Sequence, residues 1–112
     1  MRSRFEIVTD DQGRTVFHFL GPDGAALLRG LPSRDRYAVK VELMETRTAL
    51  RLRNRFVRHA DDDGHWFGVL TKKDGEPLAR TATVETEAML DQLIEQLTSN
   101  AVGAPLLKHI DA

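Results

Sequence analysis

Short stretches of alternating hydrophobic and polar residues fill the first 30 positions, and turns rich in aspartate and glycine separate them. A β-rich run at 5–9 leads into a turn at 10–13 and then into an alternating stretch at 14–20. The turn Gly-Pro-Asp-Gly at 21–24 precedes a third short stretch at 25–29. Alternation with a period of two, bounded by turn residues, predicts three antiparallel strands.

The same order of stretches and turns recurs later in the chain. Residues 5–29 align on residues 56–80 without gaps, at an offset of 51, with 8 identities in 25 positions. The identical pairs are Phe5 and Phe56, Asp10 and Asp61, Asp11 and Asp62, Gly13 and Gly64, Asp23 and Asp74, Gly24 and Gly75, Leu27 and Leu78, and Arg29 and Arg80. Most of them supply turn geometry or core, so the match predicts a structural repeat that arose by duplication.

A helical period of hydrophobic residues follows each set of strands. In 83–100 the apolar stripe consists of Met89, Leu90, Leu93, Ile94 and Leu97. We expect Thr83 to cap the N-terminus of this helix. The earlier helix, predicted over 33–50 with Ser33 as its cap, carries Tyr37, Val41, Met44 and Thr48 on one side, with Val39, Leu43, Thr46 and Leu50 beside them.

These elements predict an α+β fold formed by tandem duplication of ββ(β)α units, an antiparallel sheet with both helices packed on one face. The whole chain, 1–112, is expected to be a single domain of two repeats, at about 4–52 and about 54–101. Gly103 and Pro105 interrupt the segment that follows, so a loose C-terminal tail is expected over 102–112.

Composition narrows the possible functions. The chain of 112 residues has a formal net charge of −1 and no cysteine, which excludes disulfides, thiolate metal sites and cysteine nucleophiles. Its first residues have no apolar stretch typical of a secretory signal, and no window approaches the length of a membrane-spanning helix. A cytoplasmic protein without membrane contact is therefore expected.

The near-zero net charge conceals a basic segment. Residues 34–58 hold eight basic and three acidic residues, a balance of +5, so the remainder carries −6. We call five arginines of this segment the basic stripe; with Trp66 they are the candidate binding residues. The basic stripe consists of Arg47, Arg51, Arg53, Arg55 and Arg58.

Two interpretations of the basic stripe stay open. In an extended chain Arg51, Arg53 and Arg55 point to one face of a sheet, where they would bind phosphate or an acidic partner. Alternatively, the arginines protect an edge strand from pairing with other chains and form ion pairs with the acidic residues of the second helix. Those acidic residues are Glu85, Glu87, Asp91 and Glu95.

Catalytic and metal-binding motifs are not recognisable. His59, Asp61 and Asp63 have the spacing of the first calcium ligands of an EF-hand, but Leu70 stands where the loop needs its bidentate glutamate. A solvated turn is the preferred interpretation, so no metal and no cofactor is assigned. The serines lie outside any nucleophile elbow, and there is no phosphate-binding glycine loop.

The repeat resembles that of a known family. Gly64-His65-Trp66 and the turn and strand Asp74-Gly75-Glu76-Pro77-Leu78-Ala79 are similar to motifs of the YegP-like proteins, also called DUF1508 or UPF0339. The resemblance covers about residues 4–101. It implies two ββ(β)α units around an antiparallel sheet, and it implies no known reaction. The chain departs from the family before the second helix and at Gly68, which replaces an aromatic residue.

The sequence therefore favours a small non-catalytic protein, a protein-interaction module that uses its exposed sheet face or the basic stripe. The partner is an unidentified protein, and the chain is a monomer or a weak homodimer. The alternative is weak binding of nucleic acid or a phosphate ligand through Arg51–Arg58. Aromatic residues that stack on bases are few, since Trp66 is the main candidate.

Overall fold

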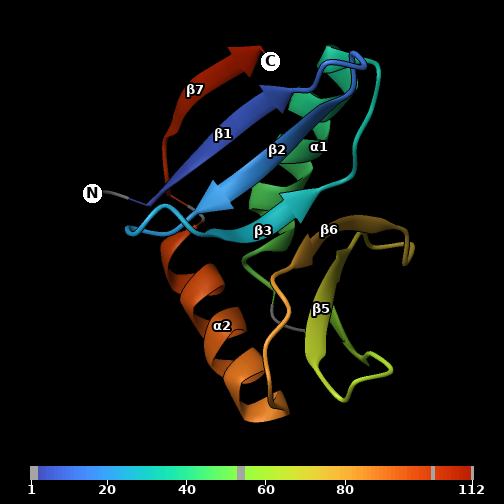
Figure 1. Cartoon of the computed structure of the whole chain (residues 1–112), viewed down its shortest axis with the longest axis vertical. Helices are drawn as coiled ribbons and strands as arrows, with labels where there is room; N and C mark the ends of the chain where they lie inside the picture. Colours follow the sequence, from blue (N-terminus) through green and yellow to red (C-terminus); the bar gives the residue numbers. More distant parts are fainter. Residues whose placement is uncertain (1–2, 53–54, 102, 112) are drawn as a thin grey trace.

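The computed structural model describes residues 3–52, 55–101 and 103–111. One seven-stranded sheet and two helices make up the fold (Figure 1). In chain order the elements are β1 (Arg4–Thr9), β2 (Thr15–Leu20), β3 (Ala26–Gly30), α1 (Arg36–Ala49), β4 (Phe56–Ala60), β5 (Trp66–Thr71), β6 (Pro77–Thr81), α2 (Glu87–Asn100) and β7 (Leu106–Asp111). The strands lie in the order β4-β5-β6-β3-β2-β1-β7. Neither helix is long and apolar enough to span a membrane.

The strand pairings agree with the expected α+β class and differ from it at one edge. The first six strands pair antiparallel, and β3 joins the two sets of strands by pairing with β6. The expected loose tail instead contributes β7, which pairs parallel with β1. Among the described strands, only this short C-terminal pairing departs from an antiparallel sheet. Helix α2 ends at Asn100, Gly103 and Pro105 disfavour further helix, and the chain then continues extended along β1.

The two sets of elements share local details at the offset of 51. Asp10 Oδ1 accepts hydrogen bonds from the backbone of Gln12 and Arg14, and Asp61 Oδ1 accepts them from Asp63 and His65. The glycines that close these turns both have positive φ, 78° and 79°. Equivalent turns therefore have equivalent conformations, although their origin by duplication stays a prediction.

Both helices begin later than predicted. Asp35, not Ser33, caps α1, and its side chain accepts a hydrogen bond from the backbone N–H of Tyr37. Thr86, not Thr83, caps α2 and accepts from Met89. The preceding residues stay extended because they pair with β2 and β5 in two equivalent bridges, Thr15 with Ser33 and Trp66 with Val84.

The helices cover one face of the sheet and share one core with it. Phe5, Phe17, Phe19 and Leu28 extend from β1 to β3 on this face, and their side chains are at most 1% exposed. Helix α2 buries four of its five predicted residues, Leu90, Leu93, Ile94 and Leu97, but Met89 is exposed. Helix α1 buries Val39, Leu43, Thr46 and Ala49, whereas Tyr37 and Met44, from the other row that the sequence singled out, face solvent.

Candidate binding face of the sheet

The sheet face opposite the helices carries a continuous row of side chains. Because neighbouring strands are paired in register, one residue of each strand lies directly beside the next in this row. The row crosses six strands and consists of Glu6, His18, Arg29, Arg80, Val69 and Val57. We call this surface the uncovered face.

The β1 and β2 end of the row is polar and mostly buried. Arg4 Nε lies 2.8 Å from Glu6 Oε2, and both side chains are less than 15% exposed. Burial first, and the positive charge of Arg29 second, lower the pKa of His18 against the opposing charge of Glu6. The His18 ring is therefore held neutral near pH 7, and the positive charge in this neighbourhood lies on arginine side chains.

The β4 and β5 end of the uncovered face is apolar and aromatic. The His59 and Phe67 rings stack at 5.3 Å between centroids, with an angle of 19° between their planes. On the other side of β5, the Arg80 guanidinium lies 3.7 Å from the centroid of the Phe67 ring. Val57, on edge strand β4, is 46% exposed. We call Val57, His59 and Phe67 the aromatic patch.

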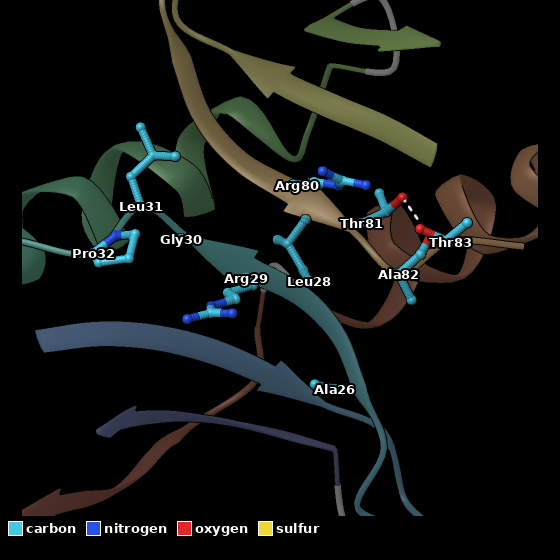
Figure 2. Close-up of a pocket in the computed structure, with 10 residues that line it drawn as sticks. All are labelled: Ala26, Leu28, Arg29, Gly30, Leu31, Pro32, Arg80, Thr81, Ala82 and Thr83. Atoms are coloured by element: carbon cyan, nitrogen blue, oxygen red, sulfur yellow. Dashed lines mark hydrogen bonds between the residues drawn. The ribbon is translucent and has the colours of Figure 1, made fainter. Parts of the chain in front are cut away.

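Between these two ends, β3 meets β6 at a hollow of about 480 Å³. Arg29 and Arg80 are direct partners in the strand register and both line this hollow. Figure 2 shows their guanidinium groups pointing apart, that of Arg29 toward β2 and that of Arg80 toward β5. Apolar residues and two threonines form the rest of the lining: Ala26, Leu28, Gly30, Leu31, Pro32, Thr81, Ala82 and Thr83.

The structure divides the predicted basic stripe. Arg58 donates from Nε and Nη2 to Asp91 Oδ1 on α2, with an Nε–Oδ1 distance of 2.9 Å. Arg47, on α1, places its guanidinium carbon 5.0 Å from the centroid of the Phe5 ring. The ion pair of Arg58 with an acidic residue of the second helix is the arrangement that the edge-protection interpretation expects.

The remaining stripe residues do not form the expected extended row. Arg51 lies in a turn after α1, Arg55 lies just before β4 and outside the strand, and Arg53 is outside the described residues. Arg55 instead lines a second hollow, of about 290 Å³, together with two lysines of the β5–β6 turn. The strand starts only at Phe56, so alternation along a strand cannot align these arginines.

Trp66 also lies apart from the uncovered face. It is half-buried, packs against the core and forms the bridge with Val84 that precedes α2. Sequence reasoning missed the exposed residues Arg29, Arg80 and His59 and the half-buried Phe67. A signal was present for two of them, because Arg29 and Arg80 are identical at equivalent positions and neither a turn nor the core explains an exposed arginine there.

The aspartate turn before β5 brings possible metal ligands together. One ligand atom each of Asp61, Asp63 and His65 lies within 4.8 Å of the others. Asp61 Oδ1 is already engaged by two backbone N–H groups, and Asp61 Oδ2 lies 3.9 Å from His65 Nδ1. Since Asp10 makes the same backbone contacts in the equivalent turn, this arrangement serves the turn.

Fold and uncovered face together define a small α+β protein of two consecutive ββ(β)α units that share one sheet. No family model matches the chain, and no curated protein does. Among solved structures, the solution NMR structure of the Escherichia coli protein of unknown function yegP superimposes with a TM-score of 0.88 at 12% identity, over 98% of this chain and 95% of that one.

A second solved structure agrees with the first. It is the solution NMR structure of a UPF0339 protein from Shewanella oneidensis, with a TM-score of 0.86 at 12% identity over 96% of this chain and 92% of that one. The chain therefore has the YegP and UPF0339 fold, as its sequence resemblance implied. Such low identity shows the fold alone, and yegP is itself described as a protein of unknown function.

Proposed function

We propose that this chain is a small non-catalytic interaction module that binds a protein partner through the aromatic patch of its uncovered face. The observation that carries the proposal is the exposed β4–β5 end of the sheet, where Val57 is 46% exposed beside the stacked rings of His59 and Phe67. No helix of the described chain contacts this side of β4 and β5, because α2 packs on the opposite face.

The chemistry of the patch suits a protein partner. Aromatic and arginine side chains are enriched in the centres of protein interfaces, where they bury a large area with few rotatable bonds. The Arg80 guanidinium, which lies over the Phe67 ring, adds a positive charge beside the patch. A partner that covers Val57 and Phe67 would bury hydrophobic surface, and these side chains would lose little conformational entropy on binding.

A non-catalytic role is supported by the distribution of titratable groups. In the described part of the chain, the groups with shifted pKa values are Asp10, His18 and Glu42. A hydrogen bond from the backbone N–H of Arg14 lowers the pKa of Asp10 in a turn, and burial raises the pKa of Glu42 on α1. Acid–base catalysis needs such groups within one pocket, and these three lie on different parts of the fold.

Nucleic-acid binding is the second candidate. The stack of Arg80, Phe67 and His59 is the kind of platform on which unpaired bases can lie, and this favours the alternative more directly than the basic stripe does. The surface offers a single such stack within the described residues, whereas single-strand-binding proteins stack several successive bases. We therefore place this candidate second.

The proposal is tested by affinity enrichment from a lysate of the source cells, comparing the unaltered protein with two double variants. Val57→Glu with His59→Glu places charge on the aromatic patch, and Tyr37→Glu with Met44→Glu places equal charge on the exposed side of α1. We expect a partner that the unaltered protein and the α1 variant retain and the patch variant loses. Equal retention by both variants contradicts the proposal.

The same proteins separate the two candidates. Retention on single-stranded DNA at low salt, weakened steeply by added salt and lost in the patch variant, would favour the nucleic-acid function. Thermal melting of each variant shows whether it is folded, since all four positions are exposed and substitution there is expected to leave the core intact.

A further inference from the structure

The junction of β3 with β6 has an approximate two-fold symmetry. Leu28 pairs with Thr81, Arg29 with Arg80 and Gly30 with Ala79. At the offset of 51, Arg29 is equivalent to Arg80, Leu28 to Ala79 and Gly30 to Thr81. The residue before the arginine in each strand therefore pairs with the residue after the arginine in the other strand. The symmetry axis therefore passes between the two arginines, which occupy equivalent positions of the two units and lie opposite each other in the strand pairing.

This arrangement is electrostatically unfavourable in the protein alone. Like charges directly opposite each other on antiparallel strands destabilise the pairing. Within the described residues, no carboxylate forms an ion pair with either guanidinium. The two guanidinium groups point apart (Figure 2), and that of Arg80 lies over the Phe67 ring. His18, beside Arg29 in the register, adds no negative charge.

The hollow at this junction has the size and lining of a small-molecule site. Its volume of about 480 Å³ lies within the usual range for ligand pockets. Leu31, Pro32 and Ala82 supply apolar surface, and Thr83 supplies an exposed hydroxyl. Predominantly apolar walls with a few charged groups are typical of sites that bind organic ligands, since the charges orient the ligand and the walls exclude water.

We propose that this hollow binds a small organic anion whose carboxylate or phosphate group is held jointly by Arg29 and Arg80. Guanidinium groups match both oxyanions by forming two parallel N–H···O bonds, and one anion held by both replaces their repulsion with two attractions. Because the two groups point apart in the protein alone, joint binding requires both side chains to turn toward the hollow and the Arg80 guanidinium to leave the Phe67 ring. The apolar part of the ligand lies against Leu31 and Pro32. The proposal does not rest on the protein-binding function proposed for the aromatic patch, although Arg80 lines the hollow and also lies over Phe67 of that patch.

The binding test is an NMR titration of the ¹⁵N-labelled protein with benzoate, phenyl phosphate and the neutral analogue benzamide. We expect saturable shifts with one or both anions, centred on the amides of 28–31 and 80–83, and none with benzamide. The stronger of the two anions identifies the oxyanion class. Unsaturated or scattered shifts, or equal shifts with benzamide, would overturn the proposal.

Variants locate the site. Arg29→Gln and Arg80→Gln are each expected to weaken binding about tenfold or more, since each removes a charge-assisted contact. Arg51→Gln is the matched control, because Arg51 is an exposed arginine of the basic stripe away from this junction. Equal weakening by the control, or shifts centred on 55–58, would place the anion elsewhere and refute the site.

A second measurement tests the electrostatic argument without any ligand. In buffer free of multivalent anions, Arg29→Gln is expected to raise the melting temperature by about 1–4 °C, because it removes one of two opposed like charges. The stronger-binding anion should raise the melting temperature of the unaltered protein more than that of the variant at the same concentration. A lower melting temperature for Arg29→Gln would refute the repulsion on which the proposal stands.

Discussion

Replacing Gly30 with alanine tests the packing between β3 and β2 at its tightest point. A Cβ atom at this position would lie 2.3 Å from Cε1 and 2.5 Å from Cδ1 of the Phe17 ring. That ring is fully buried and also contacts Phe5, with 6.3 Å between centroids, so it has little room to withdraw. Overpacking of this kind costs about 1–3 kcal/mol.

The glycine of the corresponding strand pair in the second unit, Gly68, supplies the control. At the offset of 51, Phe17 corresponds to Gly68 and Gly30 to Thr81. The glycine therefore lies in the third strand of the first unit, β3, but in the second strand of the second unit, β5. A Cβ atom on Gly68 would have its nearest contacts at 3.4 Å, an ordinary van der Waals distance. Gly68→Ala also restricts the unfolded chain, which stabilises the folded state by about 0.4–1 kcal/mol where space allows.

Urea unfolding and thermal melting of the two variants provide the assay. We expect Gly30→Ala to lower the melting temperature by about 4–12 °C, from about 4 °C per kcal/mol, and Gly68→Ala to leave it unchanged or raise it slightly. In a Phe17→Leu background, Gly30→Ala should cost less, because the smaller side chain relieves the contact. Equal stability of Gly30→Ala and Gly68→Ala, or an undiminished cost in that background, would refute the reasoning.

Three further outcomes are expected. Thr86→Ala should lower the stability by about 1 kcal/mol in urea unfolding, because it removes the α2 cap, whereas Thr83→Ala should be nearly neutral. The lowered pKa of His18 means that the unfolded state binds more protons, so stability should fall as the pH drops below 6.5, and His18→Gln should abolish that part of the slope in a pH series. A double-mutant cycle of Arg58→Ala and Asp91→Ala should give a coupling of about 0.2–1 kcal/mol that high salt reduces, since both side chains are about half exposed; a coupling that salt leaves unchanged would contradict this.

Local features of the fold were predictable because they depend on neighbouring residues. Aspartate followed by glycine predicts the turns, and the structure has Asp10 and Asp61 in equivalent hydrogen-bonded turns closed by glycines of positive φ. The spacing of apolar residues in α2 predicts its buried side, since residues three or four apart in a helix lie on the same side. Four of its five predicted residues are buried, and Met89 marks the margin of the stripe.

Helix starts were mispredicted because a distant strand competes with the local cap. Ser33 and Thr83 are suitable cap residues, but the chain around them stays extended through the bridges with Thr15 and Trp66. The caps therefore fall at Asp35 and Thr86. Backbone hydrogen bonds between segments separated by about 18 residues are not visible in a local pattern.

In the candidate site, too, local sequence patterns were predictable and contacts between distant segments were not. The sequence alignment makes Arg29 and Arg80 equivalent, but equivalence does not imply proximity. They meet because β3 pairs with β6, an association of strands about 50 residues apart in the chain. The arginines of the basic stripe are close in sequence, but Arg58 pairs with Asp91 and Arg51 lies in a turn, so these residues do not form the expected extended row.

The sequence by itself determined the two sets of strands and helices, their turns and the α+β class, because periodicity and turn chemistry act over a few residues. Only the tertiary structure decided which strands meet, and therefore that β7 extends the sheet beside β1 and that two equivalent arginines oppose each other beside a hollow. Strand pairing between distant segments depends on the packing of the whole core, and that pairing places the residues on which the proposed anion site rests.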